Sequence, residues 1–192
     1  MSTATTSTAD SRINDIEGRI MALKKELTDA RRARPPEPVE DWELRTTEGA
    51  PIKLSQLFGE HRDLIVVHNM GRKCNYCSLW ADGLAGFAKH WPTRCAFVLC
   101  SHDPPSVAKE FAKERGWPYR VVSGASSGFA KAMGFLNAKE SPQPGASAFH
   151  RRDDGSIVRT GKTWFGPGDD FCAVWPMFEL LEGGPGEWEP AH

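Results

Sequence analysis

Two cysteines separated by two residues, Cys74 and Cys77, are the most chemically suggestive feature of this 192-residue sequence. They follow the apolar run at residues 64–68 and precede apolar positions with helical spacing, so they lie where a buried strand passes into a helix. The first turn of a helix carries unpaired N–H groups and a partial positive charge, which favour a thiolate over a thiol. We therefore expect a lowered pKa for Cys74, and Arg72 and Lys73 should lower it further.

The spacing also assigns a different role to each sulfur. In a helix the second sulfur lies beneath the first, so the pair can form and break a disulfide with little backbone movement. Cys74 is then the exposed attacking sulfur and Cys77 the more buried resolving one. His68 shares a strand face with Leu64 and Val66. We interpret it either as a proton acceptor beneath the cysteine pair or as a structural hydrogen-bonding residue.

Metal binding is the alternative use of such a pair. Two cysteines supply only half of a tetrahedral zinc site, and the candidates to complete it are His68, His90, Cys95 and Cys100. The sequence has no second CxxC and no HxxxH, so we favour redox chemistry and expect neither a metal nor a cofactor beyond the thiol pair itself. Five cysteines form an odd set, which argues against a structural disulfide framework. We expect Cys95, Cys100 and Cys172 to be inert.

Four regions follow one another along the chain. Residues 1–10 are rich in Ser and Thr and should be disordered. Residues 11–38 form a helix, predicted from Ser11 to Arg32, and a proline-rich linker, while residues 39–183 form one domain and 184–192 a tail. Apolar residues recur along the helix at alternating spacings of three and four: Ile13, Ile16, Ile20, Leu23 and Leu27. This stripe either packs on the main domain, which we favour, or pairs with a second copy, which leaves a homodimer open.

The main domain alternates strands and helices before ending in a hairpin. Strands are expected at 64–68, 96–100 and 119–122, with helices between them, then a hairpin at 148–158 and a closing helix at 171–181. Alternation implies parallel strands with right-handed crossovers, to which the hairpin adds antiparallel strands. The predicted class is therefore an α/β, thioredoxin-like fold, a central mixed sheet flanked by helices, with an N-terminal helical extension. Within its first long helix, Asp82 is either a solvated charge, which we favour, or an anchor for a neighbouring loop.

Charge and hydropathy exclude several classes of partner. Lys and Arg number 24 against 25 Asp and Glu, so the net charge of −1 gives no field that would attract nucleic acid. No apolar run approaches the ~20 residues that span a bilayer. The N-terminus lacks the basic start and apolar stretch of a secretory signal, and we expect a cytoplasmic protein.

Several segments resemble a known group of proteins. Residues 41–44, 54–59 and 64–67 resemble the opening segment of peroxiredoxin-like and thioredoxin-like proteins. Residues 25–31, the cysteine pair with residues 78–83, and residues 145–149 are similar to the bacterial thioredoxin-like family catalogued as domain of unknown function 899. The resemblance implies a thioredoxin-like fold and a thiol pair. Gly71 stands where peroxiredoxins have their peroxide-binding threonine, and Pro144 is the nearest candidate for the cis-proline of thioredoxins.

These observations predict a thiol–disulfide oxidoreductase acting through Cys74 and Cys77. Its expected partner is a disulfide substrate or a thiol reductant, and its candidate substrate contacts are Arg72, Tyr76, Trp80 and Pro144. Two alternatives stay open. One is a thiol peroxidase in which Cys74 attacks peroxide and Cys77 resolves the sulfenic acid, and the other is a non-enzymatic binding module on the same fold.

Overall fold

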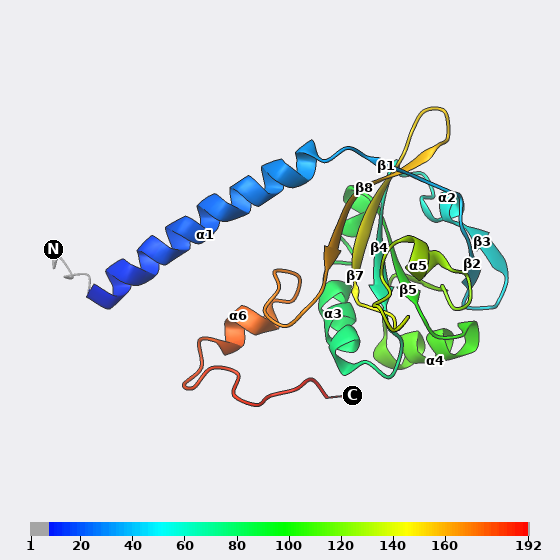
Figure 1. Cartoon of the computed structure of the whole chain (residues 1–192). Coiled ribbons are helices and arrows are strands. Elements are labelled where there is room, and N and C mark those ends of the chain that lie inside the picture. The colour runs from blue at the N-terminus through cyan, green and yellow to red at the C-terminus, as the bar shows by residue number, and fades with distance from the viewer. Residues whose placement is uncertain (1–7, 192) are drawn as a thin grey trace. The chain divides into compact units, whose positions relative to one another are not determined.

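The computed structural model describes residues 8–191, and the chain divides into two compact units between Pro35 and Pro36. Within its described residues, the first unit consists of one helix, α1 (Thr8–Ala33; Figure 1). None of the residues of α1 is buried. It begins three residues before the predicted start at Ser11, so residues 8–10 are helical rather than disordered. Residues 1–7 of that predicted disordered segment lie outside the described residues.

In the second unit, eight strands within residues 36–191 form one mixed sheet in the order β1-β8-β7-β4-β5-β6-β2-β3. The neighbours β4, β5 and β6 are parallel, and every other pair is antiparallel. The predicted parallel core with a terminal antiparallel hairpin is confirmed. The strands are β1 (Glu37–Val39), β2 (Glu43–Thr46), β3 (Pro51–Lys53), β4 (Asp63–Asn69), β5 (Ala96–Ser101), β6 (Arg120–Ser123), β7 (Gly145–Arg151) and β8 (Ile157–Trp164).

One strand and one helix differ from the sequence-based expectation. β1 lies in the predicted linker, where three residues beside a proline run have no alternating pattern, and only its pairing with β8 makes it a strand. The closing helix α6 is shorter than expected, and Met177 and Leu181, on its predicted apolar stripe, are exposed. The helices of this unit are α2 (Leu54–Leu57), α3 (Asn75–Ala85), α4 (Pro105–Arg115), α5 (Phe129–Ala132) and α6 (Val174–Phe178), with a 3₁₀ turn at Trp91–Thr93.

The two faces of the sheet carry separate apolar clusters, and strand alternation assigns the residues of β4 to them. Leu64 and Val66 pack in the cluster that contains Phe58 of the α2 segment and Phe129 of α5. The cluster on the other face joins Val67 to two residues of α3 and to the C-terminal part of the unit: Trp80, Leu84, Phe165, Cys172 and Trp175. The helix that carries the cysteines therefore covers only one face of the sheet.

No helix within residues 8–191 is both long enough and apolar enough to cross a membrane.

Candidate thiol site

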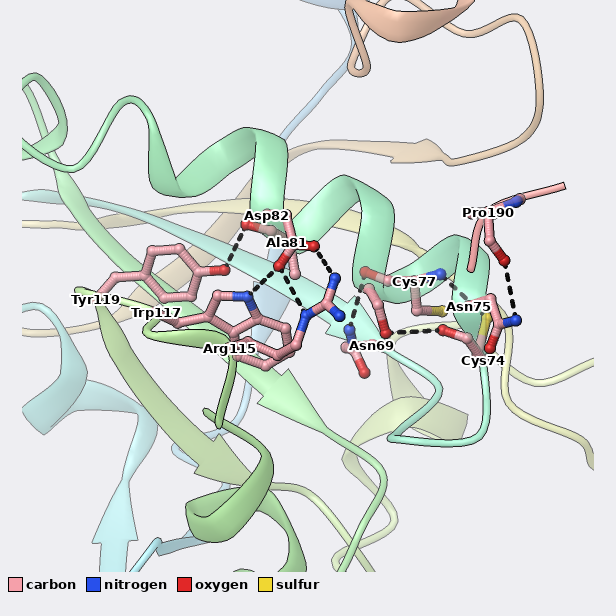
Figure 2. A network of polar contacts seen from close by, with 11 residues as sticks. Asn69, Cys74, Asn75, Cys77, Ala81, Asp82, Arg115, Trp117, Tyr119 and Pro190 are labelled. Carbon is pink, nitrogen blue, oxygen red and sulfur yellow. Dashed lines mark hydrogen bonds and ion pairs between the residues drawn. The ribbon is translucent and has the colours of Figure 1, made fainter. Parts of the chain in front are cut away.

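Cys74 lies at the N-terminal end of α3, at the predicted junction of strand and helix. β4 ends at Asn69, four residues form a loop, and Cys74 takes the extended conformation of a helix N-cap (φ −103°, ψ 100°). Its sulfur accepts a hydrogen bond from the backbone N–H of Cys77 at 3.1 Å (Figure 2). Its carbonyl oxygen accepts one from the N–H of Ser78 at 3.1 Å, the first hydrogen bond of the helix. The cap that starts α3 is thus the sulfur atom itself.

Hydrogen bonding between the two residues also shifts the pKa values of the two thiols in opposite directions. The Cys77 thiol, with the backbone N–H groups of Cys77 and Tyr76, holds the pKa of Cys74 at about 7, although partial burial of Cys74 opposes this shift. The hydrogen bond to Cys74, burial and the charge of a Cys74 thiolate all raise the pKa of Cys77. Both thiols are free, Cys74 is half-buried, and Cys77 is 3% exposed. The structure thus pairs an accessible, acidic thiol with a buried, protonated one.

The sequence suggested that the charge of Arg72 would act on Cys74, but the Arg72 side chain is directed elsewhere. Its guanidinium lies 3.4 Å from Glu110 and 2.8 Å from Glu114 of α4, and it covers the ring of Phe111 at 5.4 Å. Opposite charges within 4 Å therefore engage this cation on a neighbouring helix. The lowered pKa of Cys74 arises from hydrogen bonds at the helix N-terminus and not from Arg72 or Lys73.

Two residues that the sequence analysis missed hold the loop before Cys74. The Asn69 side chain accepts a hydrogen bond from the N–H of Gly71 at 2.8 Å and donates one to the carbonyl of Cys77 at 3.4 Å. The Asp103 carboxylate accepts a hydrogen bond from the N–H of Arg72 at 2.6 Å. Gly71 has a φ of +104°, and a Cβ there would lie 2.5 Å from an Asp103 oxygen, so this position requires glycine.

A simple signal could have identified both residues. Asn69 ends β4 and Asp103 lies two residues after β5, and these strands are parallel neighbours. Because the carboxyl ends of parallel strands meet at one edge of the sheet, polar residues that follow them are brought together there.

His68 lies on the face of the sheet opposite α3, so its predicted position beneath the cysteine pair is wrong. Its ring stacks on Phe135, with centroids 3.9 Å apart, and on Phe129, and its Nε2 lies 3.0 Å from the Ser147 hydroxyl. Burial, with a smaller effect from the charge of Arg159, lowers the pKa of His68 to about 3. The other interpretation, a structural hydrogen-bonding residue, matches this position. His68 shares its face of β4 with Val66, whereas α3 covers the face of Val67, so the imidazole and the thiols lie on opposite sides of the sheet.

The predicted substrate contacts are not all at the surface. Trp80 is 2% exposed and packs against Phe165 and Trp175, so it belongs to the core, and this prediction is corrected. Tyr76 is half-buried and stacks on Trp175 at 6.2 Å. Pro144 directly precedes β7, as expected, but no peptide bond within residues 8–191 is cis.

The C-terminal segment, defined here as residues 184–191, returns to this site. The side-chain amide of Asn75 donates a hydrogen bond to the carbonyl oxygen of Pro190 at 2.9 Å (Figure 2). The Trp188 ring meets Phe178 at 4.8 Å and Trp175 at 5.9 Å. The region predicted as a tail is therefore part of the surroundings of the thiol pair, and its aromatic residue Trp188, which packs on Trp175 and Phe178, is the signal in the sequence that could have indicated this.

Asp82 anchors α3 to the end of α4 and is not a free surface charge, which corrects the sequence-based preference. Its carboxylate pairs with Arg115 and accepts a hydrogen bond from the indole N–H of Trp117 at 2.8 Å. One residue earlier, the carbonyl of Ala81 accepts a hydrogen bond from the hydroxyl of Tyr119 at 2.7 Å (Figure 2). These contacts fix the helix two turns after the thiols.

The three remaining cysteines are buried away from this pair. Burial raises the pKa of Cys100 to about 12, and it also raises the pKa values of Cys95 and Cys172. All three are thus protonated and weakly nucleophilic near neutral pH. Within residues 8–191, no three side chains of His, Cys, Asp or Glu converge as metal ligands would.

Comparison with solved structures places this fold among known ones. Peroxidoxin BcpB from Mycobacterium tuberculosis is 21% identical, covering 67% of this chain and 84% of its own, with a TM-score of 0.55. Reduced Prx3 from Vibrio vulnificus, in complex with hydrogen peroxide, is 15% identical, covering 69% of this chain and 88% of its own, with a TM-score of 0.57. These similarities show a thioredoxin-like α/β fold. No curated protein matches the chain. The model of one family, described as a bacterial protein of unknown function (DUF899), matches residues 7–189, and the chain belongs to this family.

Proposed function

We propose that this protein is a thiol–disulfide oxidoreductase in which Cys74 attacks and Cys77 resolves. One observation carries the proposal: the Cys74 sulfur caps α3 and accepts the N–H of Cys77 at 3.1 Å, which stabilises its thiolate. A pKa of about 7 leaves a large fraction of Cys74 ionised at neutral pH, close to the optimum for an attacking thiol.

The reaction has two steps. The Cys74 thiolate attacks one sulfur of a substrate disulfide, a mixed disulfide forms, and the other substrate sulfur leaves as a thiolate. Cys77 then loses its proton to that thiolate and attacks the Cys74 sulfur, which releases the second substrate sulfur. The substrate gains two electrons and the pair becomes a Cys74–Cys77 disulfide, which a dithiol reductant returns to two thiols. The redox-active group is the cysteine pair itself.

The geometry explains how Cys77 becomes active at the right moment. Two of the causes that raise the pKa of Cys77 are its hydrogen bond to Cys74 and the charge of the Cys74 thiolate. Once Cys74 enters a mixed disulfide, its sulfur carries no charge, so the two causes that depend on the Cys74 thiolate weaken while burial of Cys77 remains. The pKa of Cys77 is therefore lower in the mixed disulfide than in the reduced pair.

The test uses reduction of a protein disulfide, with insulin as the probe and dithiothreitol as the electron source. Cys74→Ser should abolish turnover, and Cys77→Ser should accumulate a mixed disulfide through Cys74 that mass spectrometry identifies. Cys95→Ser is the matched control, because this buried thiol lies outside the pair and outside the cluster that packs against α3, and its loss should leave turnover unchanged. Turnover that survives Cys74→Ser overturns the proposal, and so does wild-type protein that never forms the Cys74–Cys77 disulfide.

Reduction of a peroxide is the second candidate, favoured by the similarity in fold to a peroxidoxin and to a peroxide-bound Prx3. Cys74 would take one oxygen as a sulfenic acid, and Cys77 would condense with it and release water. Gly71 supplies no hydroxyl beside Cys74, and the Arg72 guanidinium pairs with α4, so neither residue directs a side-chain donor to a peroxide at Cys74. Rapid oxidation by stoichiometric hydrogen peroxide, without insulin reduction, would favour this second activity.

A further inference from the structure

We infer that α1 pairs with α1 of a second copy of this chain as an antiparallel two-stranded coiled coil. The first observation is the apolar stripe of the helix. Its five large residues are between 41% and 63% exposed: Ile13, Ile16, Ile20, Leu23 and Leu27. Side chains of this kind on one stripe of a helix lower their free energy by burial against a second apolar surface. This inference is independent of the proposed redox function.

The stripe has the repeat of a coiled coil. Assigning Ile13, Ile20 and Leu27 to heptad position a places Ala9, Ile16, Leu23 and Ala30 at position d. Because α1 begins at Thr8, this core covers residues 9–30, about three heptads.

The charged residues beside the stripe favour an antiparallel pair of α1 helices over a parallel one. Positions e and g flank a coiled-coil core and set the orientation of the helices. In a parallel pair, Arg12 faces Glu17 and Glu26 faces Arg31 with opposite signs, but Arg19 at g faces Lys24 at e of the second helix, and two such repulsive contacts form by symmetry. In an antiparallel pair with Ile20 opposite Leu23 of the second copy, Glu17 faces Lys24 and Arg19 faces Glu26. Each facing pair of large charged residues is then of opposite sign.

The same antiparallel register continues to the ends of the helix. Asp10 at e faces Arg31 at e of the second copy, which adds another pair of opposite charge. In the core, Ile16 lies opposite Leu27, and Ile13 lies opposite the small Ala30. Every facing pair of charged e or g residues is therefore of opposite sign, while Arg12 faces Ala33, and this charge complementarity favours a second copy of α1 as the partner of the stripe.

One substitution distinguishes an antiparallel dimer from a parallel one. Lys24→Glu in the full chain places a second carboxylate opposite Glu17 at both symmetric contacts of the antiparallel dimer. In a parallel dimer the same change replaces the repulsion between Arg19 and Lys24 by attraction. We expect the dimer dissociation constant to rise about tenfold, from two contacts that change sign. Glu17→Lys combined with Lys24→Glu should restore it. Lys25→Glu is the matched control, because this neighbouring residue is at position f, outside the core and its flanks.

Sedimentation equilibrium measures the dimer dissociation constant of the wild type and of each variant. A reductant is present to exclude intermolecular disulfides. Wild-type dimer, weakening by Lys24→Glu and rescue by the double variant support the inference. A monomer at all concentrations overturns it, as would occur if the stripe packed on the domain of its own chain. Tighter association of Lys24→Glu overturns the antiparallel arrangement. Ile20→Glu should abolish the dimer, and a dimer that survives it means that another surface makes the contact.

Discussion

The side-chain amide of Asn75 donates a hydrogen bond to the carbonyl oxygen of Pro190 at 2.9 Å, which joins the end of the chain to the residue after Cys74. Figure 2 shows Pro190 beside the N-terminal end of α3. Tyr76, the other residue between the cysteines, stacks on Trp175, and Trp175 in turn contacts Trp188. The C-terminal segment therefore contacts Asn75 directly and is connected to Tyr76 through Trp175 of α6.

Removing the Trp188 ring should make Cys74 more accessible. Trp188→Ala deletes the contacts with Phe178 and Trp175 that hold the C-terminal segment, so Pro190 should leave Asn75 more often. We expect the rate of Cys74 alkylation by iodoacetamide to rise several-fold. Leu180→Ala is the control, since Leu180 is 79% exposed and should leave the rate unchanged. An unaltered rate in Trp188→Ala would show that the segment does not limit access.

The reactivity of Cys74 should follow its lowered pKa. Alkylation of the wild type should increase through a midpoint near pH 7, because the thiolate is the reacting form. Cys77→Ala removes the thiol that donates to Cys74, so the midpoint should move to higher pH. Thiolate absorbance in the ultraviolet, followed during a pH titration, provides a second measurement. If the midpoint is the same in both proteins, the Cys77 thiol is not the cause of the shift.

His68 should make the stability depend on pH. Its pKa in the folded protein is about 3, below the ordinary 6.5, so at intermediate pH the unfolded state binds a proton that the folded state does not. The contribution of His68 to the free energy of unfolding is therefore fully present above pH 6.5. It is lost as the pH falls toward 3, by about 1.4 kcal/mol per pH unit. His68→Gln does not titrate, so urea unfolding at pH 7 and pH 5 should show a smaller loss than in the wild type. Equal losses would contradict this account.

The same variant tests the position of His68 relative to the thiols. Because the ring lies among Phe129, Phe135 and Ser147 on the other face, His68→Gln should leave the rate of Cys74 attack and the rate of resolution in the same ratio. Stopped-flow measurement of both steps makes the comparison. Selective slowing of resolution would mean that the imidazole reaches Cys77 after all.

Loss of the Asp82 carboxylate should destabilise the fold without changing the thiols. Asp82→Ala leaves Arg115 without this ion pair and the Trp117 indole without its acceptor, at a cost of about 1–3 kcal/mol. Urea unfolding measures this cost. Lys109→Ala breaks the exposed ion pair with Glu48 and should have little effect. The midpoint of Cys74 alkylation should stay the same, and a shifted midpoint would connect the Asp82 network to the thiol site.

The sequence by itself determined the order of the main elements and the place of the cysteines. The apolar run of β4 and the turn between the strands of the β7–β8 hairpin are local signals, because burial and backbone conformation act on neighbouring residues. The apolar run before the cysteine pair and the helical spacing after it likewise placed Cys74 at a helix start, and the expectation that Cys95 and Cys100 are inert followed from the core strand that they flank. These interpretations required no knowledge of contacts between distant parts of the chain.

Only the tertiary structure decided which side chains surround the thiols. Alternation showed that His68 shares a face with Val66, but not which face α3 would cover. Likewise, the partners of Arg72 and Asp82 come from α4 and the residues that follow it, and Pro190 reaches Asn75 from the far end of the sequence. Hydrogen bonds and ion pairs act over a few ångströms in space, whatever the separation of the two residues along the chain. The local sequence pattern therefore does not predict these contacts.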